Sequence, residues 1–323
     1  MGADDGGRLC RLSPDPKSIA KKGDNAMKLA TTTSDFGNFC RTHEECVKLI
    51  HDAGFRYLDM GLGGARFFSD PNWRDEAKKL REYAESLGMK FVQAHSPNGN
   101  IISAEKHDSE LFLATRSLEL CEILGIPQVV VHAGYEKTLT DKNEWQEKNA
   151  AFYRELFPTM EKTGVCVLTE NTTHANLPDG FYLFTGPEMV EFIEYVDHPL
   201  FQAVWDTGHG NTEGQQSPQL KALGKHLYGL HVHDNTGMGD DHNLPYFGTM
   251  NMDDLMTGLI EADYKGYFTF EVLCAMQRCG HKKWHFPQSS LLKNPTLEMR
   301  IDVERLMYTI GKHCLEVYHC FEE

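Results

Sequence analysis

VCVLTENTTH (residues 165–174), AVWDTGHGN (203–211), LYGLHVHDN (227–235) and GYFTFEVL (266–273) follow one another in the second half of the chain. Each stretch contains a run of β-branched or aromatic residues, which is typical of a β-strand, and a helical stretch follows each in turn. Each run leads to one acidic or imidazole side chain: Glu170, Asp206, His231 and Glu271. Three carboxylates and one imidazole that converge at strand ends form a ligand set for a hard or borderline divalent cation.

The same alternation of strand-like and helix-like segments begins at Met27. Eight segments have the composition of strands: 28–34, 57–63, 90–96, 128–134, 165–171, 201–208, 228–234 and 267–273. Amphipathic stretches lie between them, such as 43–54, 73–88, 109–125 and 252–264. Eight β/α units predict a single (β/α)8 TIM barrel over residues 27–323. An open doubly wound sheet is the rival, but GLGGARF (61–67) fits its early phosphate-binding loop poorly.

Residues 1–26 precede this pattern and contain no apolar core segment, so they do not resemble a secretory signal. We expect them to be a disordered or expression-derived extension. No apolar run approaches the roughly 20 residues that span a bilayer. The nine cysteines are scattered without a C-x-x-C pair, which predicts reduced thiols and a cytoplasmic location.

The chain is acidic, with a formal net charge of −15 from 47 Asp and Glu against 32 Lys and Arg. Proteins whose main task is to follow phosphate backbones use clustered basic residues. The overall charge therefore opposes nucleic-acid binding as the main function, although a local basic patch is compatible with it.

The barrel gives the side-chain alternation a direct meaning. In residues 230–234, Leu230 and Val232 share one face and His231 and His233 share the other, because successive side chains of a strand alternate. In residues 268–272, the alternation directs Glu271 to the barrel interior. Polar groups at the C-terminal ends of barrel strands are where such enzymes place their chemistry.

Other candidate groups fall at the same rim. A lone histidine at a strand end is more often a hydrogen-bonded structural residue than a metal ligand. Several such groups at the same end of consecutive strands favour a metal site. The further candidates are His95, His132, His209, Asp240 and His242.

From Met27 to about Tyr318 the chain resembles the xylose-isomerase-like barrel superfamily. The resemblance rests on T-E-N at Glu170, W-D-T-G-H at Asp206 and His209, H-x-H-D at His231, D-D-H with a following glycine at 240–248, and F-E-V at Glu271. Asp59, His95 and His132 match more loosely. This superfamily includes sugar phosphate isomerases, ketose 3-epimerases and abasic-site endonucleases.

The resemblance implies one divalent metal held by Glu170, Asp206, His231 and Glu271. His231 is preferred to His233 because the family pattern is H-x-x-D, here His231 to Asp234. His233 is then either a substrate contact or a hydrogen-bonded interior residue. The other groups assigned to substrate binding are His95, His132, His209, Asp240 and His242.

The resemblance implies two main chemistries. The first is isomerisation or epimerisation of a small sugar, keto-polyol or sugar phosphate through an enediolate, with Glu170 and Glu271 as the catalytic acid and base. Mn²⁺ is the metal expected there, and Mg²⁺, Co²⁺ or Zn²⁺ could replace it. The second is zinc-dependent cleavage of abasic DNA. A dehydratase acting on a keto-polyol would share the first proton abstraction and is a third alternative.

The rim loops favour sugar chemistry. An enzyme that acts on DNA needs Lys and Arg contacts to phosphates. Only one Lys or Arg occurs in the rim segments 95–103, 132–137, 171–184, 208–216 and 234–248. The exception, CAMQRCGHKKWHFPQ (274–288), reads as a lid, a grip on one phosphate or an ordinary solvated loop. We therefore expect a small sugar as the partner, with no nucleic acid and no membrane, and a homo-oligomer by resemblance.

Overall fold

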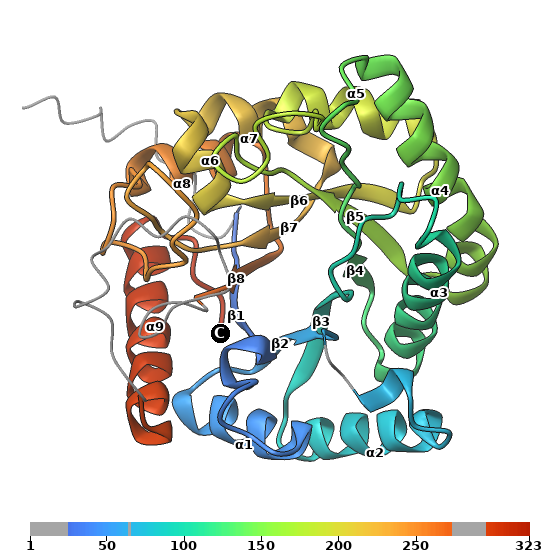
Figure 1. Ribbon diagram of the computed structural model, residues 1–323. Helices are drawn as coiled ribbons and strands as arrows, with labels where there is room; N and C mark the ends of the chain where they lie inside the picture. Colours follow the sequence, from blue (N-terminus) through green and yellow to red (C-terminus); the bar gives the residue numbers. More distant parts are fainter. Residues whose placement is uncertain (1–24, 64–65, 273–294) are drawn as a thin grey trace, which may run out of the picture.

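The computed structural model describes residues 25–63, 66–272 and 295–323 (Figure 1). Its centre is an eight-stranded sheet of parallel strands. The strands are β1 (Lys28–Thr32), β2 (Tyr57–Gly61), β3 (Lys90–His95), β4 (Gln128–Val130), β5 (Cys166–Glu170), β6 (Phe201–Asp206), β7 (Leu227–His231) and β8 (Tyr267–Phe270). All eight lie within the segments predicted from the sequence, apart from Leu227, the first residue of β7.

The sheet is curved into a barrel. Neighbouring strands follow the order β7-β6-β5-β4-β3-β2-β1-β8, so β1 pairs with both β2 and β8. The remaining junction, between β7 and β8, is joined through Val232. Its amide donates to the Thr269 carbonyl at 2.7 Å, and its carbonyl accepts from the Glu271 amide at 3.1 Å. The predicted (β/α)8 TIM barrel is confirmed.

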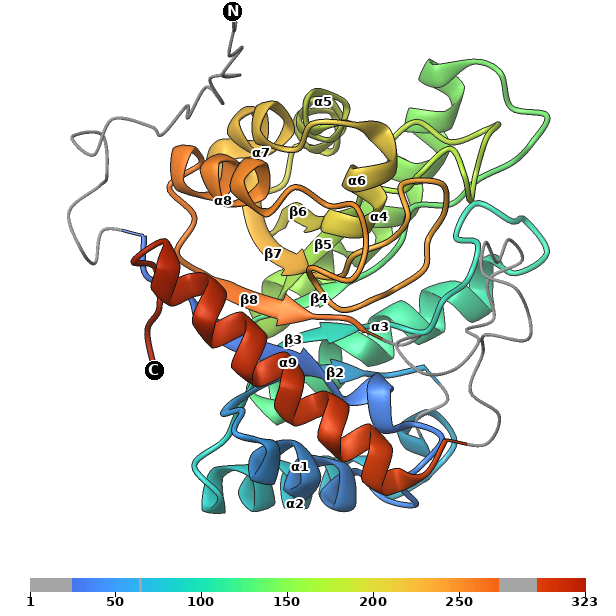
Figure 2. The same ribbon diagram turned by 90° about the vertical axis from the view of Figure 1, so that its left-hand side faces the viewer.

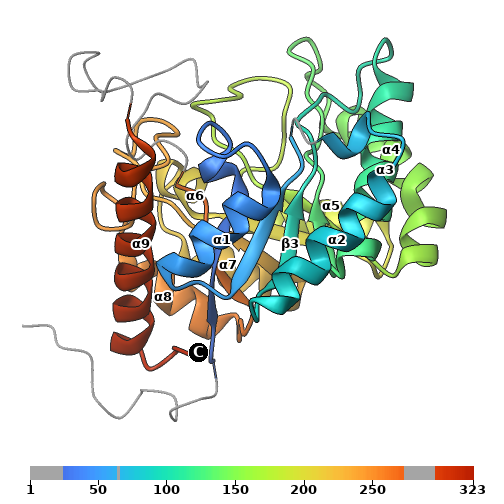
Figure 3. The same cartoon turned by 90° about the horizontal axis from the view of Figure 1, so that it is seen from below.

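Helices surround the strands on the outside (Figures 1 and 3). The helices of the described residues are α1 (His43–Ala53), α2 (Trp73–Ser86), α3 (His107–Leu124), α4 (Lys142–Thr163), α5 (Gly186–Val196), α6 (Thr207–Glu213), α7 (Ser217–Leu223), α8 (Met252–Glu261) and α9 (Leu297–Val317). Short 3-10 turns add η2 (Thr33–Phe36), η3 (Arg66–Phe68) and η4 (Gly224–His226). Figure 2 shows α9 running across the barrel wall at β8.

The last strand shows how the predicted alternation is realised. Phe268 and Phe270 are fully buried, and the ring of Phe270 packs edge-on against Phe55 at 6.2 Å. Gly311 allows α9 to approach this ring, because a Cβ atom there would lie 2.6 Å from Phe270 Cζ. Hydrophobic side chains therefore fill the layer between strands and helices, and Glu271 remains for the interior.

Among the described residues, none of the helices combines the length and apolar composition needed to cross a membrane. Residues 1–24 lie outside the described part, so the expected extension stays a prediction.

Candidate metal centre and active site

Four strands bring the predicted ligands together. Glu170, Asp206 and His231 are the last residues of β5, β6 and β7, and Glu271 directly follows β8. One ligand atom from each of the four lies within 4.8 Å of the others. Because parallel strands of a barrel end at the same face, strand-end positions in the sequence become neighbours in space.

Glu170 lies at the centre of this group. Its Oε1 is 2.8 Å from His231 Nδ1, and its Oε2 is 2.6 Å from His132 Nε2. Burial by itself would raise the pKa of Glu170, but the imidazoles of His231 and His132 outweigh burial and hold this pKa well below its ordinary value. Glu170 is thus ionised at neutral pH and suited to bind a cation.

His231 is completely buried between two carboxylates. Its Nδ1 also lies 3.6 Å from Glu271 Oε2. Burial lowers the pKa of His231, but Glu170 and Glu271 raise it well above its ordinary value. A proton on this ring therefore offsets part of the negative charge of the two carboxylates.

His95 and His132 extend the group toward solvent. Their Nε2 atoms lie 3.0 Å apart, and His95 Nε2 is 3.7 Å from Glu170 Oε2. The His132 side chain is 36% exposed, whereas that of Glu170 is 5% exposed. A molecule that approaches the centre from this side would meet these imidazoles first.

A second set of contacts surrounds Asp206 and Asp240. His233 Nε2 lies 3.0 Å from Asp206 Oδ2, and the two oxygens of Asp240 lie 3.3 Å from His209 Nε2 and 3.1 Å from His242 Nε2. Burial would raise the pKa of Asp240, but His242 and His209 hold it well below its ordinary value. In turn, Asp240 outweighs burial and raises the pKa of His242 to about 10.

The surroundings of His233 bear on whether it contacts the substrate or is a hydrogen-bonded interior residue. Its ring is fully buried, stacks on His242 with centroids 3.8 Å apart, and contacts Asp206. Its backbone amide donates to the Thr207 hydroxyl oxygen at 3.1 Å. These contacts describe an interior residue within reach of the centre, and a role toward substrate stays a prediction.

Two asparagines that the sequence does not single out hold Asp206 and Asp240 in place, the first through its backbone and the second through its carboxylate. Asn171 accepts from the Asp206 amide at 2.7 Å and donates to the Asp206 carbonyl at 3.1 Å. Asn176 donates to Asp240 Oδ2 at 3.0 Å. Asn171 lies in the T-E-N motif and could have been noticed there, whereas Asn176 lies in a loop without a recognisable pattern.

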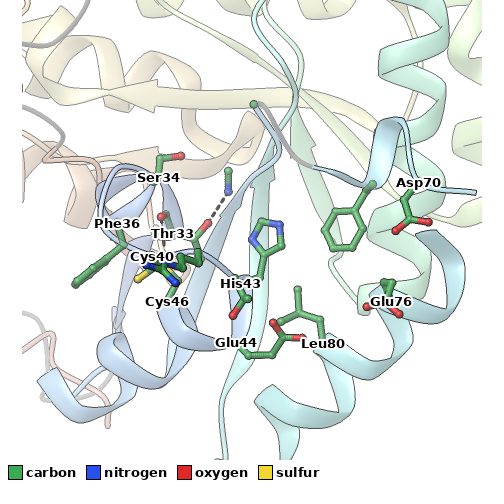
Figure 4. Close-up of a pocket in the computed structure, with 16 residues that line it drawn as sticks. Thr33, Ser34, Phe36, Cys40, His43, Glu44, Cys46, Asp70, Glu76 and Leu80 are labelled. Atoms are coloured by element: carbon green, nitrogen blue, oxygen red, sulfur yellow. Dashed lines mark hydrogen bonds between the residues drawn. The ribbon is translucent and has the colours of Figure 1, made fainter. Parts of the chain in front are cut away.

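A cavity of about 390 Å³ lies at the ends of β1 and β2 and the beginning of α1 (Figure 4), and its described lining includes none of the four predicted metal ligands. Thr33, Ser34 and Phe67 are among its lining residues, and Phe67 stacks on His43 at 5.1 Å. Trp73, the first residue of α2, lies under the guanidinium groups of Arg74 and Arg116, each 4.1 Å from its ring. The basic segment 274–288 lies outside the described residues, so its three readings stay open.

Comparison with known proteins agrees with this geometry. Residues 47–284 match the family described as the xylose isomerase-like TIM barrel, and the chain belongs to this family. A protein of Methanocaldococcus jannaschii described as uncharacterised is 27% identical over 231 residues, 69% of this chain and 76% of that protein.

Solved structures share the fold at low sequence identity. D-psicose 3-epimerase from Clostridium cellulolyticum H10, determined with D-tagatose, superposes with a TM-score of 0.72 at 18% identity, over 90% of this chain and 99% of that chain. The IolI protein with a bound zinc atom superposes with a TM-score of 0.68 at 17% identity, over 90% and 99% of the two chains.

Proposed function

We propose that this protein is a divalent-metal-dependent isomerase or epimerase of a small sugar, keto-polyol or sugar phosphate. The observation that carries the proposal is the group Glu170, Asp206, His231 and Glu271, whose ligand atoms lie within 4.8 Å of one another. Structural similarity to sugar 3-epimerases supports the same class of reaction.

The donor set fits a divalent cation. Three carboxylates that approach one another inside a barrel repel unless positive charge lies between them, and burial strengthens that repulsion. Oxygen ligands with one imidazole suit Mn²⁺, with Mg²⁺, Co²⁺ or Zn²⁺ as substitutes. When bound, such an ion polarises a substrate carbonyl and stabilises the negative charge that develops as a neighbouring proton leaves.

The chain's own residues would move the proton. Glu170 ends β5 and Glu271 follows β8, two strands that are not neighbours, so the two carboxylates would approach a bound substrate from different directions. One would remove the proton beside the carbonyl, and the other would return a proton to the opposite face or the adjacent carbon. His95, His209 and His242 would bind the hydroxyl groups.

Zinc-dependent cleavage of abasic DNA is the second candidate, and one observation favours it. Each ligand that the endonuclease relatives would require is present and lies in the clusters described above: His95, His132, Glu170, Asp206, His209, His231, Asp240, His242 and Glu271. The acidic chain and the rim loops with a single Lys or Arg oppose it, because phosphate contacts need cations. A dehydratase shares the first proton transfer and differs in the fate of the enediolate.

Deuterium uptake tests the proposal. The Mn²⁺-loaded protein is incubated in D₂O with a panel of ketoses and ketose phosphates, and the substrates are followed by proton NMR. We expect stereospecific exchange beside the carbonyl, lost in Glu170→Gln and Glu271→Gln and kept in Glu155→Gln, an exposed carboxylate on α4. Near-full activity in either catalytic variant would refute the two-glutamate mechanism. No exchange, with nicking of abasic duplex DNA by the zinc-loaded protein, would establish the second candidate.

The wider setting follows from the same proposal. A small sugar is the partner that the acidic rim supports, rather than nucleic acid. We also infer a cytoplasmic location and a homo-oligomer, which cell fractionation and light scattering on the purified protein would test.

A further inference from the structure

Three histidines of the centre are held in the same way. In each, Nδ1 lies 2.9 Å from a backbone carbonyl oxygen: Ser96 for His95, Asn171 for His209 and Glu271 for His242. A carbonyl oxygen only accepts hydrogen bonds, so each of these Nδ1 atoms carries the ring proton. Each Nε2 then faces the centre: that of His95 faces His132 and Glu170, and those of His209 and His242 face Asp240. Metal-binding histidines are commonly anchored through their second nitrogen in this manner.

His231 is turned the opposite way. Its Nδ1 faces Glu170 and Glu271, so the outer nitrogen is Nε2. This atom is buried and has no hydrogen-bond partner among the described residues. The carboxylate that it faces is Asp59, whose Oδ2 lies 3.6 Å away. His231 therefore has a carboxylate at the place where the other three rings have a backbone carbonyl.

Asp59 is equally unusual from its own side. It lies in β2 with 1% of its surface exposed, and its Oδ1 has no hydrogen-bond partner in the described part of the chain. Its ion pair with His231 is the only one found for it among those residues. A buried carboxylate costs several kcal/mol unless it is paired, so a barrel interior retains one where a partner is present.

We propose that Asp59 is a positioning residue for His231: its carboxylate keeps Nε2 protonated and thereby presents Nδ1 as the metal ligand. The separation of 3.6 Å is an ion-pair contact and exceeds a hydrogen bond. A carboxylate in this position also makes the imidazole a stronger electron donor than a carbonyl would. This inference rests on the proposed function, because it assumes that His231 binds the metal.

Metal affinity and the His231 tautomer test this inference together. Mn²⁺ binding to wild-type protein and to Asp59→Asn is measured by calorimetry, with Thr31→Val as the matched control. Thr31 is another fully buried barrel residue, and its hydroxyl has no hydrogen-bond partner in the described ranges. A threonine cannot form an ion pair with His231. We expect Asp59→Asn to weaken Mn²⁺ binding by about 10- to 100-fold and Thr31→Val to leave it unchanged.

The second readout is the protonation of the His231 ring in the wild-type protein, and a His231→Gln variant serves only for assignment. Long-range ¹H–¹⁵N spectra of the Zn²⁺-loaded protein, with His231 assigned by comparison with His231→Gln, should show the ring protonated at Nε2. Equal Mn²⁺ affinities in wild type and Asp59→Asn, or a His231 proton on Nδ1, would overturn the role of Asp59 and leave the proposed function standing. Failure of the wild-type protein to bind Mn²⁺ or Zn²⁺ would overturn both.

Discussion

His231 and His233 lie two residues apart and are both completely buried, yet they belong to different groups of side chains. His231 shares the four-ligand group with Glu170, whereas His233 is grouped with His242 and Glu271. We expect His231→Ala to lose most of its Mn²⁺ after dialysis and His233→Ala to keep one ion per chain, as measured by elemental analysis. The reverse result would make His233 the ligand.

At the residue scale, the sequence predicts a site residue where an acidic or imidazole side chain falls at the end of a strand. Glu170, Asp206, His231 and Glu271 could be located because each terminates an apolar run. Asn176 could not, because its contact with Asp240 depends on the path of two loops that are 64 residues apart. The orientation of the His231 ring, with Nε2 facing Asp59, likewise could not be predicted from the sequence.

At the scale of elements, Arg300 connects three of them. This buried residue of α9 donates to Asp35 of η2 at 2.8 Å, to the Val272 carbonyl just after β8 at 3.3 Å, and to Glu304. The end of β8, and with it Glu271, is thereby tied to a helix on the outside of the barrel.

Removing this guanidinium should be costly. We expect Arg300→Met to lower the free energy of unfolding by about 3–5 kcal/mol, because Asp35 and Glu304 would be left buried without their cation. Arg305→Met is the matched control, since the Arg305–Asp302 pair of the same helix is exposed and should contribute about 0–1 kcal/mol. Urea unfolding measures both; equal losses would contradict the role of the buried cluster.

Asp35 adds a pH dependence to this cluster. Burial raises the pKa of Asp35 from its ordinary 3.8 to about 7, against the opposing effect of Arg300. Between pH 4 and 7 the native protein therefore holds a proton that the unfolded chain releases, so this group makes the free energy of unfolding fall as pH rises through that window. The difference between wild type and Asp35→Asn in urea unfolding at several pH values should show this slope. A constant difference would contradict it.

The helices show the limits of pattern reading. The amphipathic stretches 43–54 and 73–88 correspond closely to α1 and α2 because glycines end their periodic patterns. Helix α4 was not among the segments named from the sequence, and it contains Pro158, which lacks an amide donor and usually ends a helix. Packing of Trp145, Tyr153 and other buried residues against the barrel holds α4 together despite this proline.

At the scale of the whole molecule, the order of eight strands and the closed sheet could be predicted from the number and spacing of β/α units. The number of hydrogen bonds that join β7 to β8 could not be predicted from the sequence. In the structure that junction depends on Val232, with its two backbone hydrogen bonds to Thr269 and Glu271.

At this junction the proposed metal would act as a structural cross-link as well as a chemical group. His231 ends β7 and Glu271 follows β8, so an ion bound by both residues would link the two strands of this junction. Hydrogen exchange should report this: Mn²⁺ is expected to slow exchange of the Val232 and Glu271 amides more than that of the Val129 amide in β4. Uniform slowing would mean only general stabilisation. The proposed ion would then strengthen a seam that two backbone hydrogen bonds already join, so metal supply would affect how long the folded barrel survives.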